Sequence, residues 1–192
     1  MKLITDHIVG KMIEAEIIAE QDRELYAFGL EQGMWLVLNL LTMVVIGLLM
    51  DMLLACLYFL LAYVPLRIYA GGYHARTPLH CYFGGIVLML TALLMIKWFP
   101  WTMWRCAGVM AIASLIIWRL APVEDSNKPL DEMEKTVYAR RARKVAAVEI
   151  GVVAIAGISG WLTITRSIAI SFGLSAMVLM LGKLNVNKQI MF

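Results

Sequence analysis

Charged residues are scarce in this chain: Asp, Glu, Lys and Arg make up 16% of its 192 residues, whereas soluble domains carry about a quarter. Hydrophobic residues make up 61%. They are grouped in blocks near the length that crosses a bilayer, about 17–25 residues, rather than spread as stripes. The shortage of charge excludes an ordinary soluble domain. It predicts an all-α, polytopic membrane helix bundle folded as one domain over residues 1–192.

Histidine and cysteine, common zinc ligands, are also few, with three of each. The sequence has no Cys-x-x-Cys or His-Glu-x-x-His pattern, and a zinc site at His74, His80 and Cys81 would need a fourth ligand that no second motif supplies. We therefore expect no metal and no other cofactor. Cys56 and Cys106 lie inside apolar blocks, where a thiol behaves as a small hydrophobe. The net charge of +3 is too small to indicate nucleic-acid binding, and we expect none.

The apolar blocks predict about six membrane spans. Only Asp51 separates the first two blocks, and a turn around Arg166 separates the last two. Because some blocks are near the lower length limit, four spans plus two re-entrant segments are the alternative. The blocks run approximately over Met34–Met50, Met52–Ala70, Tyr82–Phe99, Met103–Leu120, Val145–Thr165 and Ser167–Gly182.

The distribution of basic residues predicts which side of the membrane each loop faces. With six spans, most Lys and Arg residues fall on one side, and the other side holds Lys97, Arg105 and Arg166. Since cytoplasmic loops carry the excess of Lys and Arg, both termini and the 66–81 loop are predicted to be cytoplasmic.

Two further segments have distinctive charge patterns. Residues 1–33 interleave apolar and acidic positions, which predicts an amphipathic helical region on the membrane surface or against the bundle. Residues 121–144 begin with a turn-rich connector and end in a basic, helix-compatible stretch. We predict a basic cytoplasmic loop there that contacts anionic lipid, with an acidic peptide as the alternative ligand.

An irregular island between Arg67 and Cys81 interrupts the apolar blocks. Ionisable groups and irregular backbone cost free energy between membrane-spanning segments, so this segment is expected to serve a function. His74 and Cys81 supply an imidazole and a thiol, the base and the nucleophile that cysteine catalysis requires at minimum. On one straight helix they would lie about 10 Å apart along the axis, whereas proton transfer needs about 3 Å. Gly71-Gly72 and Pro78 supply breaks that allow the chain to fold back.

Residue spacing alone leaves alternatives open for this island. His80 is a competing base, but on a helix it would point about 100° away from the adjoining Cys81, so we prefer His74. Cys81 would then begin the third span, where a helix N-terminus favours a thiolate. Because one Cys and one His are a weak signal, a polar hinge with purely structural histidines is the non-catalytic interpretation.

At these residues the chain resembles the AgrB family, the accessory gene regulator protein B peptidases of quorum-sensing systems. The likeness rests on Arg67, Gly71-Gly72-Tyr73-His74-Ala75 and Cys81, with seven residues from His to Cys. Two further matches, in the family's order, are Tyr26-Ala-Phe-Gly29-Leu30-Glu31 and Ala121-Pro122-Val123-Glu124 with Asn127-Lys128-Pro129. After about residue 145 the resemblance is in hydropathy only.

The resemblance implies a cysteine endopeptidase of the bacterial cell membrane that acts from the cytoplasmic side. It would cleave the C-terminal part of an AgrD-type autoinducer propeptide and promote thiolactone or lactone cyclisation. By motif position Cys81 is the nucleophile and His74 its base, while Arg67, Gly71 and Gly72 are supporting positions. Neither substrate-binding residues nor a third catalytic group are identified.

The resemblance also implies the partners of the chain: an AgrD-like propeptide, the lipid bilayer and, as in the family, a second copy in a homodimer. The alternative function is a non-enzymatic membrane peptide transporter or sensor-partner module. That alternative explains the spans and the basic loop, but it leaves the island from Arg67 to Cys81 unexplained.

Overall fold

A computed structural model describes residues 2–73, 77–124 and 131–190 of the chain, and these residues form helices with no β-strand. This confirms the predicted all-α class. The helices are α1 (Lys2–Glu14), the 3₁₀ helix η1 (Glu20–Asp22), α2 (Arg23–Leu49), α3 (Leu53–Ala70), α4 (Pro78–Trp98), α5 (Met103–Leu120), α6 (Glu132–Ile158) and α7 (Leu162–Ile190).

The chain divides into two compact units, Met1–Met43 and Val44–Phe192. The first unit contains α1, η1 and most of α2. In α1, Thr5 and Val9 are buried while Asp6 and Lys11 are exposed. Residues four apart share one helix face, so α1 has one buried face, while its apolar residues Leu3, Ile4 and Ile8 are exposed.

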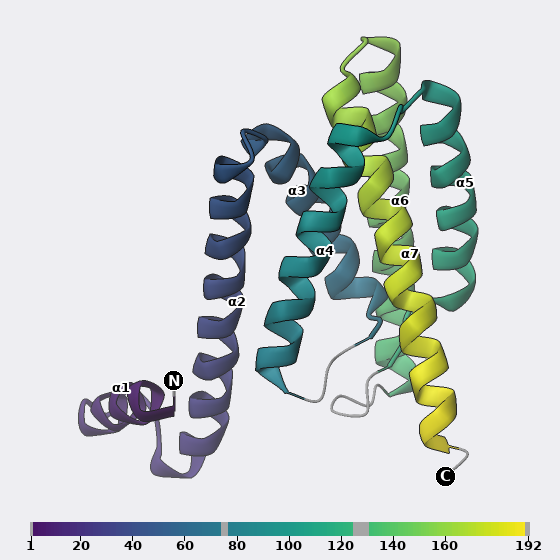
Figure 1. The fold of residues 1–192 in the computed structure, drawn as a ribbon. Coiled ribbons are helices and arrows are strands. Elements are labelled where there is room, and N and C mark those ends of the chain that lie inside the picture. The colour runs from purple at the N-terminus through teal and green to yellow at the C-terminus, as the bar shows by residue number, and fades with distance from the viewer. Residues whose placement is uncertain (1, 74–76, 125–130, 191–192) are drawn as a thin grey trace. The chain divides into compact units, whose positions relative to one another are not determined.

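In the second unit, α7 is the central helix and packs against α3, α4, α5 and α6 (Figure 1). Its buried face carries Ala169, Phe172 and Ala176, which meet buried residues of α3, α5 and α6. Several of those neighbours are alanines, and small side chains allow helix backbones to approach closely. The core therefore depends on close helix packing around α7.

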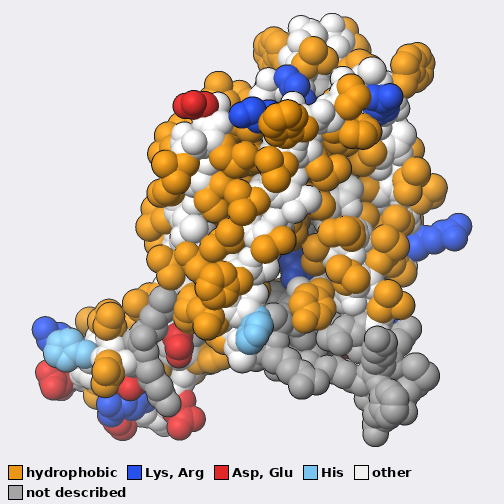
Figure 2. All heavy atoms as spheres, in the orientation of Figure 1, with side chains coloured by type: hydrophobic (Ala, Val, Ile, Leu, Met, Phe, Trp, Pro, Cys, Tyr) orange, Lys and Arg blue, Asp and Glu red, His pale blue; other side chains and the backbone are white. Residues whose placement is uncertain are grey.

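Among the residues that the structure describes, five helical segments are long and apolar enough to cross a membrane: Glu20–Leu49, which includes α2, then α3, α4 and α5, and Leu162–Leu184 of α7. Figure 2 shows hydrophobic side chains over most of the visible face, with a group of Lys and Arg at its upper end. About six spans were predicted, and the difference is α6. Its first half is too charged to qualify, although its 27 residues, about 40 Å long, run along the bundle beside α5 and α7.

The predicted turn around Arg166 is wrong. The structure ends α6 at Ile158 and begins α7 at Leu162, so the turn falls inside the predicted block Val145–Thr165. Arg166 lies within α7, in the same helix as the predicted block Ser167–Gly182. An arginine between two apolar blocks was therefore not a turn signal.

The actual turn is made by Gly160, whose φ of 75° is a conformation that glycine adopts readily. The amide of Trp161 donates to the carbonyl of Ala156 at 2.8 Å, and the amide of Gly160 donates to the carbonyl of Gly157 at 3.2 Å. This pair of hydrogen bonds is the Schellman arrangement that ends helices at a glycine. Gly160 is the sequence signal that identifies this boundary.

The α3–α4 and α5–α6 connections lie at the same end of the second unit (Figure 1). The amide of Val123 donates to the carbonyl of Ala70 at 2.9 Å, and Gly71 forms an isolated parallel bridge with Val123. The end of α3 is thus joined to the segment that follows α5. Three of the residues predicted to be functional, Arg67, Gly71 and Gly72, lie at or next to this junction.

Candidate active site at the start of α4

The predicted site residues lie on both sides of the α3–α4 connection. Arg67 is in the last turn of α3, Gly71 and Gly72 follow that helix, and Cys81 is in the first turn of α4. His74 lies outside the residues that the structure describes. The predicted pairing of His74 with Cys81 therefore stays a prediction, whereas the surroundings of the other four residues can be described.

Arg67 holds the backbone that follows α3. Its Nη1 donates a hydrogen bond to the carbonyl of Gly71, and its Nη2 donates to the carbonyl of Tyr73. One planar guanidinium thus spans two alternate peptide groups, a geometry that the single ammonium of lysine does not reproduce. Arg67 fixes the path of residues 71–73, the segment that leads directly to His74.

Glycine is required at positions 71 and 72 for two reasons: the backbone conformation, and the lack of space for a side chain. The φ angles of Gly71 and Gly72, 74° and 124°, lie in a region that residues with a side chain rarely adopt. A Cβ atom on Gly71 would lie 2.2 Å from the carbonyl oxygen of Val123. A Cβ atom on Gly72 would lie 2.3 Å from Nη1 of Arg67 and 3.2 Å from the side chain of Val178. Either addition would displace the segment.

Helix α7 holds the other side of the same segment. The amide of Tyr73 donates to the carbonyl of Val178 at 3.1 Å. A Cβ atom on Gly182 would lie 2.6 Å from the Tyr73 nitrogen and 2.6 Å from the Gly72 carbonyl carbon. The backbones of α7 and of residues 72–73 are therefore in direct contact. We name residues 71–73 with Arg67, Val123, Val178 and Gly182 the glycine clamp.

Cys81 is exposed and not in a disulfide. Its amide donates to the carbonyl of Thr77 at 3.2 Å, within the first turn of α4. Thr77 is the N-cap of this helix, its hydroxyl accepts from the amide of His80 at 3.4 Å, and Pro78 occupies the first helical position. Threonine at the N-cap and proline at the first helical position are both typical of helix starts. The thiol is thus presented at the amide end of a helix, as the sequence predicts.

His80, the alternative base, has a local partner. Its Nδ1 is hydrogen-bonded to the hydroxyl of Thr77, three residues earlier. This contact ties the ring to the capping turn of α4.

The other two thiols are buried, as predicted from their apolar surroundings. Cys56 in α3 is fully buried, Cys106 in α5 is 3% exposed, and neither forms a disulfide. Neither side chain is presented to a substrate. Cys81 is the exposed thiol of the chain.

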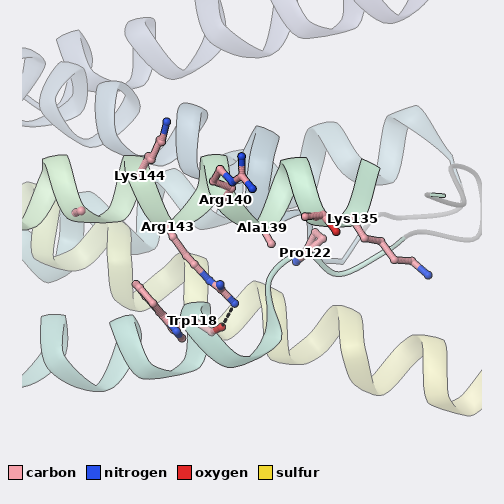
Figure 3. A pocket seen from close by; sticks show the side chains of 9 residues that line it. Trp118, Pro122, Lys135, Ala139, Arg140, Arg143 and Lys144 are labelled. Atoms are coloured by element: carbon pink, nitrogen blue, oxygen red, sulfur yellow. Dashed lines mark hydrogen bonds between the residues drawn. The ribbon is translucent and has the colours of Figure 1, made fainter. Parts of the chain in front are cut away.

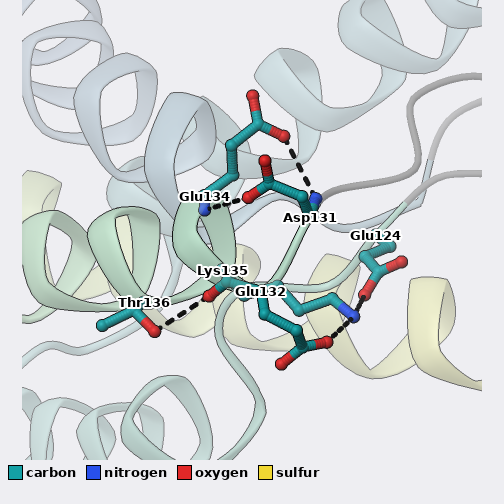
Figure 4. Close-up of polar contacts among 6 residues, drawn as sticks. All are labelled: Glu124, Asp131, Glu132, Glu134, Lys135 and Thr136. Atoms are coloured by element: carbon teal, nitrogen blue, oxygen red, sulfur yellow. Dashed lines mark hydrogen bonds and ion pairs between the residues drawn. The ribbon is translucent and has the colours of Figure 1, made fainter.

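The segment predicted as a basic cytoplasmic loop over 121–144 is helical from Glu132 onward, because α6 begins there. Asp131 caps the helix: its carboxylate accepts from the amide of Glu134 at 2.6 Å, and the Glu134 carboxylate accepts from the amide of Asp131 at 3.2 Å (Figure 4). This reciprocal arrangement is a capping box. The basic residues therefore lie on a helix, in the stretch whose sequence is compatible with a helix.

Lys135 connects this helix to the glycine clamp. Its ammonium lies 2.7 Å from Glu124, the residue after Val123, and 2.9 Å from Glu132 (Figure 4). Hydrogen bonds to Glu124 and then to Glu132 hold the pKa of Lys135 above its usual value. The segment after α5 is thus attached both to α3 and to α6.

Three comparisons with known proteins bear on this site. Residues 4–181 match the family model described as Accessory gene regulator B. A curated protein of Clostridium perfringens (strain SM101 / Type A), whose name describes it as AgrB-like, is 24% identical over 136 residues, which cover 67% of this chain. That alignment covers 64% of the relative, so the chain spans less than two thirds of its length. No solved structure matches the chain.

Proposed function

Because the chain belongs to the accessory gene regulator B family, we propose that it is a membrane cysteine endopeptidase that processes an AgrD-type autoinducer propeptide for quorum sensing. It cleaves the C-terminal part of this precursor and promotes cyclisation to a thiolactone or lactone. The observation that carries the proposal is an exposed thiol, Cys81, at the start of α4, with the adjoining backbone held by the glycine clamp. A polar hinge alone would not need that clamp.

In this proposal Cys81 is the nucleophile and His74 is its general base. His74 directly follows Tyr73, whose carbonyl is held by Arg67 and whose amide is held by Val178. Both backbone hydrogen-bonding groups of the residue before the base are therefore fixed. Such preorganisation matters because proton transfer requires heavy atoms about 3 Å apart.

The first chemical step forms a thioester. His74 takes the thiol proton of Cys81, and the sulfur attacks a peptide carbonyl carbon in the C-terminal part of the precursor. The C–N bond then breaks, His74 gives its proton to the leaving amine, and the C-terminal fragment departs. The N-terminal part of the precursor remains attached to Cys81 as an acyl-enzyme.

The second step closes the ring. A Cys thiol or a Ser hydroxyl within the precursor attacks the thioester carbon, and its proton passes through His74 to the departing sulfur of Cys81. The products are a thiolactone or a lactone and the free enzyme thiol. Exclusion of water at the membrane surface favours this attack over hydrolysis.

The proposed location is the bacterial cell membrane, with both termini and the Cys81 loop on the cytoplasmic side, an arrangement in which α6 crosses the membrane together with the five apolar helices. The excess of Lys and Arg at this end of the second unit supports the orientation. The proposed partners are the propeptide, the bilayer and a second copy of the chain in a homodimer.

The test is processing of a synthetic precursor by the full chain in proteoliposomes. The precursor should carry an amphipathic start, a central Cys and an acidic C-terminal part. We expect a released C-terminal fragment and mainly cyclic product, identified by mass spectrometry. Mainly linear product would contradict the cyclisation step. An intact precursor that crosses the membrane would instead support the alternative, a non-enzymatic peptide transporter or sensor-partner module.

A further inference from the structure

A basic groove lies between the C-terminal end of α5 and the first half of α6 (Figure 3). Its volume is about 690 Å³, within the usual range of small-ligand sites, about 300–1,000 Å³. Its position is separate from Cys81, and the proposed chemistry makes no use of it. The lining residues include Trp118, Pro122, Lys135, Arg140, Arg143 and Lys144.

The groove carries unbalanced positive charge. Lys135 is paired with Glu124 and Glu132. Within the part of the chain that the structure describes, Arg140, Arg143 and Lys144 form no ion pair. Three cations within little more than one helical turn of α6 repel one another, and a bound anion would relieve that repulsion.

Arg143 is held in place at the centre of the groove. Its guanidinium lies 4.8 Å from the ring centroid of Trp118, and its Nη2 donates to the Trp118 carbonyl at 3.3 Å (Figure 3). Its Nε is buried and has no hydrogen-bond partner among the described residues. Arginine held against an aromatic ring is well suited to a phosphate, because it combines charge with several donors.

Exposed apolar side chains extend from the groove along the bundle. On α5, Trp118, Leu115 and Ile112 follow one another at helical spacing, and Leu115 and Ile112 are 62% and 63% exposed. On α6, Val148 and Ile155 are 67% and 66% exposed. A water-soluble partner would leave these residues uncovered, whereas acyl chains would cover them. Tryptophan at such a boundary is typical of the membrane interface.

We propose that the basic groove binds the phosphate headgroup of an anionic phospholipid, with the acyl chains along the exposed faces of α5 and α6. Arg143 contacts the phosphate, the positive charges of Arg140 and Lys144 on the same helix add to the attraction, and Trp118 lies at the level of the glycerol backbone. Basic sites of this kind between helices, on the cytoplasmic side, are a recognised mode of lipid binding. An acidic peptide also carries negative charge, but it has no acyl chains to cover the exposed apolar side chains of α5 and α6.

The test is native mass spectrometry of the full chain in detergent, with phosphatidylglycerol or phosphatidylcholine of identical acyl chains. We expect the first phosphatidylglycerol molecule to bind at least about tenfold more tightly, since each interfacial cation contributes about 1 kcal/mol. The Arg140→Gln/Lys144→Gln variant should reduce this preference to within about twofold. Both side chains are exposed, so the fold should be retained, as circular dichroism would verify.

The matched control is Arg119→Gln/Lys183→Gln, which removes two exposed cations from the same end of the second unit, outside the groove. It should keep the preference for phosphatidylglycerol. Equal affinity of the unaltered chain for both lipids, or equal losses in both variants, would overturn the proposal. Displacement of phosphatidylglycerol by a hexaglutamate peptide or by free glycerol 3-phosphate at similar concentration would also overturn it, because neither competitor carries acyl chains.

Discussion

The Cys81→Ala variant is expected to lose precursor cleavage on the order of 10³-fold or more, because a nucleophile and its base act as a unit. Cys81→Ser should be nearly as inactive, since a hydroxyl at its ordinary pKa is a weaker nucleophile than a thiol. The measurement is the rate of C-terminal fragment release in proteoliposomes, quantified by mass spectrometry. Cys81 is exposed, so neither change removes packing from the core.

Two other cysteines supply matched controls for this result. Cys56→Ala and Cys106→Ala remove a thiol from buried positions in α3 and α5. Each change leaves a small cavity and lowers stability slightly, but cleavage should stay within about twofold of the unaltered chain at a temperature where the variant is folded. Cleavage that survives Cys81→Ala, or that disappears in a folded Cys106→Ala variant, would mean that the nucleophile is assigned wrongly.

The second large effect is expected at the glycine clamp. In Gly72→Ala the new methyl group would overlap Arg67 and force a backbone with φ of 124° into strain. In Gly182→Ala the methyl group would overlap the backbone of residues 72 and 73. Either change displaces the peptide unit before His74. Since a misplacement of about 1 Å can reduce catalysis about 10²-fold, we expect losses of that order in fragment release.

Two glycines in the same unit serve as controls. Gly84 lies in α4, three residues after Cys81, and Gly108 lies in α5, and a Cβ atom at either meets nothing within 4 Å. Gly84→Ala and Gly108→Ala should therefore process precursor normally. Thermal unfolding of all four variants separates a local displacement from general loss of structure. Normal activity in Gly72→Ala and Gly182→Ala would contradict a positioning role for the clamp.

Local sequence patterns predicted much of this architecture. The grouping of apolar residues predicted the helical membrane fold, and the break at Pro78 led to the prediction that Cys81 lies at the start of a helix. Gly71-Gly72 predicted the break after α3. These features depend on hydropathy and backbone preference over a few residues, which a sequence expresses directly.

Features that depend on packing between distant segments could not be predicted in this way. Gly182 and Val178 appeared as ordinary residues of an apolar block, yet α7 contacts the α3–α4 connection at both of them. Val123 likewise joins α3 through a backbone hydrogen bond with no side-chain signature. The turn at Gly160 differs, because it has a local signal in the sequence. The prediction placed the turn at the charged residue Arg166, whereas the glycine marks the boundary.

The most direct test of the central claim is the alkylation rate of Cys81 by iodoacetamide at pH 7, in the unaltered chain and in His74→Ala and His80→Ala. Because the thiolate is the reacting form, we expect His74→Ala to slow alkylation by about tenfold or more and His80→Ala to change it less than about twofold. Burial of Cys56 and Cys106 keeps the signal specific to Cys81. Equal rates in the unaltered chain and in His74→Ala, or slowing only in His80→Ala, would contradict activation of Cys81 by His74.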